Sequence, residues 1–311
     1  MSKKQINTAM TDSELQAFLN KKNKDKLIYI IIAVIGVVVT LLATLMTFMP
    51  LMLLGILVAG VFIFLTSKIS KEMKRYVSDN VVRSVINSVF DGAFYDPFGR
   101  LSDNIIENTE LGFSSFNEIS GSDYISGVYN GLNVEMSDVK LVQVTRVHTK
   151  DGVRETRTTV FEGPWMICDF GKELSADLLL VERSGLGKKF AKGGIKTESE
   201  EFNKNFLIES DNEHDAFYIL TPHMMEYILE MDQKGGGKTH MRFMRGGKVH
   251  IAINSGRNSF ELSGTNVDLA FLKSKFESEL RYITDIIDKT AAIINNTSDT
   301  PVKPSNEIGK S

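Results

Sequence analysis

The stretch "QKGGGKTH", residues 233–240, has the composition closest to a phosphate-binding site in this sequence. A phosphate-binding loop has the spacing G-x-x-x-x-G-K-[ST] and joins a strand to the N-terminus of a helix. Counting back from Gly237-Lys238 places Asp232 where the first glycine is required, and its carboxylate would repel phosphate. The apolar pattern also predicts a helix before the glycines and a strand after them. We therefore interpret the stretch as a helix end and a linker.

Other residues that could do chemistry are scattered along the chain. The five histidines show no H-x-x-x-H spacing, and the single cysteine, Cys168, lies in the apolar run "WMICDF" and is predicted to be a buried, inert thiol. One acidic cluster is interpreted as a solvated loop, with a divalent cation site as the alternative; it comprises Glu200, Glu201, Asp211, Glu213 and Asp215. No catalytic residue, cofactor site or metal site is predicted.

A basic β-hairpin is the strongest candidate for an interaction site. Asp151-Gly152 has the composition of a two-residue hairpin turn, and pairing outward from it sets Arg146 opposite Arg157 and Val142 opposite Phe161. The base of this hairpin is apolar, whereas its distal half is polar on both faces and is predicted to project as a ribbon. The predicted interaction residues are Arg146, His148, Lys150, Arg154 and Arg157. A ribbon that is simply solvated is the alternative.

The elements that position this hairpin begin with an uncharged N-terminal run. No charged residue lies between Leu27 and Thr66, and a membrane-spanning helix needs about 20 apolar residues. Pro50 near the middle of the run favours a turn at Met49-Pro50. The sequence therefore predicts a transmembrane helical hairpin at 27–67, with spans at 27–48 and 51–67.

Lysine and arginine flank this hairpin on both sides and are absent from its turn. Because basic residues stay on the cytoplasmic side, both termini are expected in the cytosol. No charged residue lies within either span, which is typical of an anchor rather than a conduit. The flanking basic residues are Lys21, Lys22, Lys24 and Lys26 before the first span, and Lys68, Lys71, Lys74 and Arg75 after the second.

The rest of the chain is expected to be an α+β domain of antiparallel strands with flanking helices. The predicted division is a cytosolic N-terminal segment at 1–26, the hairpin, a cytosolic domain at 68–290 and a disordered tail at 291–311. Helices are expected after the second span and at both "PHMMEYILEMDQK" and "VDLAFLKSKFESELRYITDIIDKT", whereas "AFYIL" is expected to be a strand. A second hairpin is expected to have a three-residue loop at Arg245–Gly247, pairing Phe243 with Val249.

The order of these elements resembles a family of bacterial membrane proteins known as domain of unknown function 3137. The similar stretches are "SDYISGVYNGLNVEMSDVKL", "VFEGPWMICDFGKELSADLLLVER" and "ESEEFNKNFLIESDNEHDAFYILTPHMMEYIL". With the hairpin, the resemblance covers roughly residues 27–288. It implies a multi-pass protein of the bacterial cytoplasmic (inner) membrane, and it implies no catalytic residue because the family has no assigned activity.

These observations favour a membrane-anchored cytosolic interaction or scaffold module. Its expected partners are membrane lipids with anionic headgroups and another membrane or cytosolic protein, and a homo-oligomer is an open possibility. Nucleic acid is not expected, because the formal net charge is −3. The first alternative is a membrane-associated enzyme with an unrecognised site, although a non-enzymatic module is favoured over it. The second alternative is an oligomeric channel or transport accessory protein.

Overall fold

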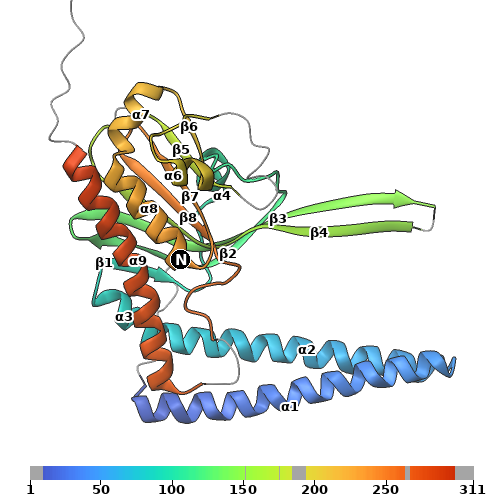
Figure 1. Cartoon of the computed structure of the whole chain (residues 1–311). Coiled ribbons are helices and arrows are strands. Elements are labelled where there is room, and N and C mark those ends of the chain that lie inside the picture. The colour runs from blue at the N-terminus through green and yellow to red at the C-terminus, as the bar shows by residue number, and fades with distance from the viewer. Residues whose placement is uncertain (1–9, 151, 175, 184–193, 263–266, 298–311) are drawn as a thin grey trace, which may run out of the picture. The chain divides into compact units, whose positions relative to one another are not determined.

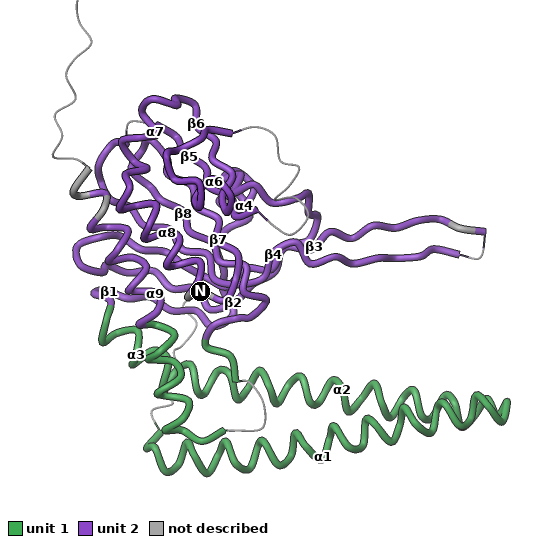
Figure 2. Tube along the Cα trace, viewed as in Figure 1, with its two compact units in different colours: residues 1–89, 260–280 green, residues 90–259, 281–311 purple. Residues whose placement is uncertain are grey.

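The computed structural model describes residues 10–150, 152–174, 176–183, 194–262 and 267–297. The part of the predicted tail from residue 298 onward and the turn residue Asp151 lie outside these residues. Two compact units make up the chain, and they are coloured separately in Figure 2. Unit 1 comprises residues 1–89 and 260–280, and unit 2 comprises residues 90–259 and 281–311. The predicted four-part division of the chain stays a prediction.

Unit 1 contains two long helices, α1 (Asp12–Leu45) and α2 (Met49–Val77). Thr11 caps α1 through a reciprocal hydrogen-bonded box with Glu14. The chain turns at residues 46–48, so Pro50 lies in the first turn of α2 and the turn expected at Met49-Pro50 is wrong. Proline is accommodated there because the first N–H groups of a helix have no partner within the helix.

The two helices pack closely through small residues. A Cβ atom added to Gly55 would lie 2.8 Å from the Gly36 carbonyl oxygen and 2.9 Å from the Thr40 nitrogen. Ala33, Ala43 and Ala59 are also buried, whereas most of the larger side chains between Leu27 and Phe64 are exposed. By length and composition, α1 and the helix that begins at Met49 are each long and apolar enough to cross a membrane.

Beyond its apolar part, unit 1 has a base formed by distant parts of the chain. Wider π-helical turns at Ser78–Val82 (η1) and helix α3 (Arg83–Asn87) continue α2, so the single helix predicted here is confirmed as a continuous helical segment. The Gln16 side chain accepts a hydrogen bond of 2.7 Å from the Leu269 N–H and donates one of 3.1 Å to the Val267 carbonyl. Lys74 pairs with Glu261 at 3.0 Å.

Unit 2 is built on one eight-stranded sheet with the order β1-β2-β3-β4-β8-β7-β5-β6, and every pairing is antiparallel (Figure 1). The strands are β1 (Asp91–Asp96), β2 (Glu118–Tyr129), β3 (Leu132–Thr149), β4 (Gly152–Asp169), β5 (Leu178–Glu182), β6 (Phe206–Ser210), β7 (Lys238–Phe243) and β8 (Lys248–Asn254). The predicted α+β class is confirmed.

Helices cover both faces of the sheet. Helix α8 (Pro222–Gly235) and the later turns of α9 (Leu269–Thr297) lie across one face, where the Tyr227 hydroxyl donates to the Ile286 carbonyl at 3.3 Å. On the other face, α4 (Asp103–Asn108) and the segment after it pack on a buried cluster around Phe161 and Trp165. The remaining helices are α6 (Glu200–Asn205) and α7 (Glu213–Ile219).

Two further local predictions fail, and both failures have a physical reason. "AFYIL" lies in helix α7 rather than in a strand, because Asn212 accepts a hydrogen bond from the Asp215 N–H and so caps a helix there. The first hairpin pairs Arg146 with Glu155 and Leu141 with Phe161, and not Arg146 with Arg157 or Val142 with Phe161. Its register is shifted because Thr149 pairs with Gly152 at the end of the ladder, with an irregularity after Leu141.

Candidate functional site

The projecting ribbon comprises residues 143–149 of β3 and 152–158 of β4. Figure 1 shows these strand ends extending beyond the rest of the sheet. Residues 152–159 are all exposed, whereas the base of the hairpin enters the core at Leu141 and Phe161. The predicted division between an apolar base and a polar ribbon is therefore confirmed. The ribbon does not contribute to the core of unit 2.

The five predicted basic residues do not share one face of the ribbon. Directly paired residues in an antiparallel ladder point to the same side, and side chains alternate along each strand. Arg146 pairs with Glu155 and His148 with Val153, which places Arg157 on this side as well. The other side carries Arg154 opposite Val147, and Lys150 lies at the tip. The proposed role of these five residues in an interaction stays a prediction.

Ion pairs within unit 2 neutralise much of the first face. Glu155 lies 2.9 Å from the Arg146 Nε and 3.1 Å from an Arg157 nitrogen, and Arg157 also pairs with Glu118 on β2. Hydrogen bonds from the two arginines lower the pKa of Glu155. Lys150 and Arg154 make no ion pair with any residue that the structure describes. The unpaired positive charge of the ribbon therefore lies at its tip and on the Val147 face.

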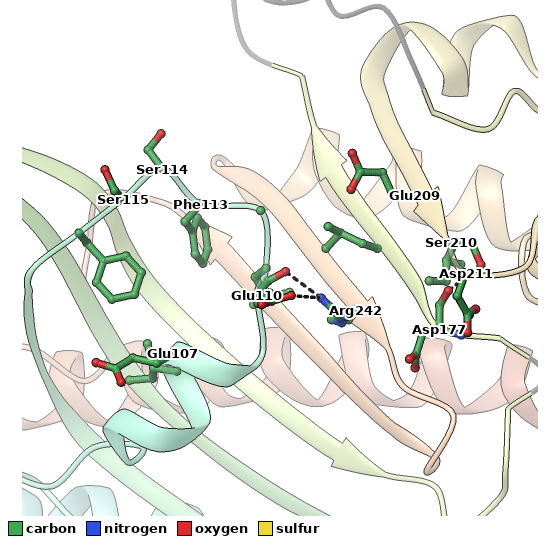
Figure 3. Close-up of a pocket in the computed structure, with 16 residues that line it drawn as sticks. Glu107, Glu110, Phe113, Ser114, Ser115, Asp177, Glu209, Ser210, Asp211 and Arg242 are labelled. Atoms are coloured by element: carbon green, nitrogen blue, oxygen red, sulfur yellow. Dashed lines mark hydrogen bonds and ion pairs between the residues drawn. The ribbon is translucent and has the colours of Figure 1, made fainter.

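A groove of about 690 Å³ opens on the sheet face that carries α4 (Figure 3). One wall is the extended segment that follows α4, and the other is formed by the ends of β5 and β6. Its lining combines apolar side chains with five carboxylates and one guanidinium. The lining residues are Ile106, Glu107, Glu110, Leu111, Gly112, Phe113, Ser114, Ser115, Phe116, Asp177, Leu178, Leu179, Glu209, Ser210, Asp211 and Arg242.

Some of these carboxylates already have cationic partners. Arg242 lies 3.7 Å from the Glu110 carboxylate, and Arg245 makes hydrogen bonds of 2.9 and 2.7 Å to one Asp211 oxygen. This contact lowers the pKa of Asp211. In the described parts of the chain, Glu107 and Glu209 make no hydrogen bond or ion pair through their carboxylates. The groove thus presents two exposed, unpartnered negative charges on opposite walls.

The acidic cluster expected from the sequence does not converge. Asp211 alone lines the groove, while Glu200 and Glu201 lie in the first turn of α6 and Glu213 and Asp215 lie in the first turn of α7. Among the described residues, no group of three or more His, Cys, Asp or Glu side chains is arranged to hold a metal ion. The carboxylates of the groove come from three distant segments, so no local spacing reveals them.

Two histidines are buried beneath the groove, on strands β7 and β8. The second hairpin has the predicted register, with Phe243 opposite Val249, so His240 and His250 are not directly opposed, as expected. The His240 Nδ1 lies 3.0 Å from the Leu111 carbonyl oxygen. Burial lowers the pKa of each histidine from 6.5 to about 4. Both are therefore neutral at physiological pH.

Trp165 defines the tautomer of His250. The indole Nε1–H lies 3.4 Å from the His250 Nδ1, and an indole nitrogen can only donate. The Nδ1 atom must therefore be the acceptor, which places the imidazole proton on Nε2. The Thr109 hydroxyl lies 3.3 Å from the same Nδ1 atom. This enclosed arrangement has no access for a substrate, so we assign it a structural role.

The glycine-rich stretch has the context that its sequence predicts. Helix α8 precedes it, Gly236 ends the helix with φ of 61°, and strand β7 follows. A left-handed residue after the last turn is a common helix end. The order of helix, glycines and strand is the reverse of a phosphate-binding loop.

The fold therefore defines a protein with a helical hairpin of membrane-spanning length and a unit built on an antiparallel eight-stranded sheet. Residues 159–291 match the family "Protein of unknown function (DUF3137)", which confirms the resemblance seen in the sequence for this part of the chain. No curated protein matches the chain.

Among solved structures, the chain is similar to the mycobacterial trehalose monomycolate transport factor A, TtfA. The similarity covers 71% of this chain and 96% of that chain, with 11% sequence identity and a TM-score of 0.36. A likeness of this extent carries no argument about fold or function.

Proposed function

We propose that this protein is a membrane-anchored interaction module of the bacterial cytoplasmic membrane. Helices α1 and α2 span the bilayer as a hairpin, both termini lie in the cytosol, and the projecting ribbon contacts a protein partner. The observation that carries the proposal is the ribbon itself, because its ordered, exposed strands extend beyond the sheet without serving the core of unit 2. These two strand ends are not stabilised by burial in unit 2, and we attribute their extension beyond the sheet to contact with another molecule.

The charge distribution favours a protein partner over a lipid surface. A basic residue near an anionic membrane contributes about 1 kcal/mol. Arg146 and Arg157 are paired with carboxylates, so Lys150 and Arg154 together contribute only about 2 kcal/mol to lipid binding. The ribbon also exposes 52% of Val147 and 59% of Val153, which are apolar contact surfaces for a protein.

The proposal is tested with a photo-crosslinking amino acid at Val147 in the full-length protein, in intact membranes. We expect a discrete protein adduct that disappears when Lys150 and Arg154 are both changed to Glu. The same amino acid at Tyr218, an exposed position on α7, is the control and should not give this adduct. Adducts with lipid alone, or none at all, would overturn the proposed role of the ribbon.

The membrane topology is tested separately with reporter fusions. A fluorescent protein fused after Ser311 should be fluorescent in the cytosol, and alkaline phosphatase at the same position should be inactive. The reverse result would place the C-terminus outside the cell and remove the proposed cytosolic role.

A further inference from the structure

The ribbon and the groove carry matching features that no contact among the described residues uses. The ribbon offers two unpaired cations, Lys150 and Arg154, beside the exposed Val147. The groove offers two unpartnered carboxylates, Glu107 and Glu209, around apolar lining residues. Opposite charges arranged around complementary apolar surface are what fix the orientation of a protein–protein contact.

Within one molecule, these two surfaces do not meet. Both belong to unit 2, and the ribbon extends away from the body of the sheet, whereas the groove lies between the segment after α4 and the ends of β5 and β6 (Figures 1 and 3). A ribbon that fills the groove must therefore come from another molecule.

We infer that the groove of one copy receives the ribbon tip of a second copy. This inference rests on the proposed role of the ribbon and names its partner. Val147 and Arg154 point to the same side because they are directly paired in the ladder, so one face of the tip presents both groups to the groove. In this contact Val147 packs on the apolar lining, while Arg154 and Lys150 approach Glu209 and Glu107.

The size of the groove fits a ribbon tip. Its volume of about 690 Å³ is large enough for a few side chains and too small for a folded element.

The contact is heterologous, because the surface used by one copy differs from that used by its neighbour. Such contacts close into a ring or continue as an open chain. The assembly therefore has a free ribbon and a free groove wherever it does not close.

The closing experiment is disulfide crosslinking between two differently tagged full-length copies in their native membrane. One copy carries Val147→Cys on the ribbon, and the other carries Ser114→Cys in the groove. The native thiol gives no background because Cys168 is buried. We expect a crosslink that contains both tags. A copy with Tyr218→Cys instead of the groove cysteine is the control. It should crosslink at least about fivefold less, and a fivefold change corresponds to roughly 1 kcal/mol of binding free energy.

Charge reversal tests the pairing. Glu107→Lys with Glu209→Lys in the groove copy should lower the crosslinked fraction roughly fivefold, since each exposed ion pair contributes up to about 1 kcal/mol. Adding Lys150→Glu with Arg154→Glu to the ribbon copy should restore it. Equal crosslinking to groove and control, or no rescue by the combined reversal, overturns the inference. The unreactive Cys168 thiol confirms that each variant is folded.

The outcomes separate the two proposals. If Val147 gives an adduct with a different protein and no crosslink between copies, the ribbon keeps its proposed role and the self-association is wrong. If neither adduct nor crosslink forms, both proposals are wrong.

Discussion

Acid should destabilise unit 2 through its two buried histidines, and the single tryptophan reports this directly. Protonation of His250 would place an N–H on Nδ1 against the N–H of Trp165, 3.4 Å away, and would put a charge in an enclosed site. Burial, with smaller contributions from Lys248 and Arg242, already lowers the pKa of His250 to about 4. The folded state therefore takes up a proton less readily than the unfolded state.

The magnitude follows from the difference in pKa between the two states. The unfolded value is 6.5 and the folded value is about 4 for both His240 and His250. Because the folded pKa is lowered, the neutral histidine favours folding above pH 6.5, and this contribution is lost as the pH falls towards 4. At pH 5 each histidine reduces the free energy of unfolding by about 2 kcal/mol relative to neutral pH, or about 4 kcal/mol for the pair.

The assay is urea unfolding of the detergent-solubilised protein, followed by the fluorescence of Trp165 between pH 7.5 and 5. His250→Gln retains an acceptor for the indole N–H but does not titrate in this range. We expect this variant to lose about half of the pH dependence, or about 2 kcal/mol at pH 5. His148→Gln, on the exposed ribbon, is the control and should behave like the unchanged protein. A pH dependence identical in both variants would refute the reasoning.

Three further predictions concern the packing of the chain. Gly55→Val should destabilise the helical hairpin by about 1–3 kcal/mol, because its side chain would meet backbone atoms of α1. Gly60→Val should have little effect, because a Cβ atom added at Gly60 meets nothing within 4 Å. Thermal unfolding in detergent measures both variants. Cys168 should resist labelling by maleimide until the protein unfolds, because its side chain is enclosed and burial raises the pKa of its thiol to about 12. Rapid labelling of the folded protein at pH 7.5 would contradict this burial. Gln16→Ala should reduce stability by about 1–3 kcal/mol, because the Leu269 N–H loses its acceptor, and an unchanged unfolding midpoint would show that water replaces it.

Local patterns predict most of the elements in this protein. The helix at "PHMMEYILEMDQK" and the alternation around Phe243 each depend on residues close in sequence, and each is confirmed. The register of the first hairpin is different, because its polar ribbon has no buried face to specify one alignment. The five basic residues are grouped in the sequence by their position along the hairpin, and the structure divides them between two faces and a tip.

The groove could not be predicted in the same way. Glu107, Asp177, Glu209 and Arg242 are far apart in the sequence, and they meet only because β5 is inserted between β6 and β7 in the sheet. Each of these residues, read alone, is an ordinary surface charge. Strand order is determined by long-range pairing, which a single sequence does not reveal through spacing or periodicity.

The composition of unit 1 has a consequence for how the protein is made. Its base needs the segment 260–280, which leaves the ribosome only after nearly all of unit 2 has been synthesised. Until then, unit 1 contains Leu15 and Leu19, which are buried in the finished unit, but lacks its buried side chains Leu272 and Phe276. The hairpin helices are thus available for insertion early, whereas the base of the same unit is completed late. A nascent chain truncated before residue 260 would therefore leave this apolar surface open to chaperones and proteases.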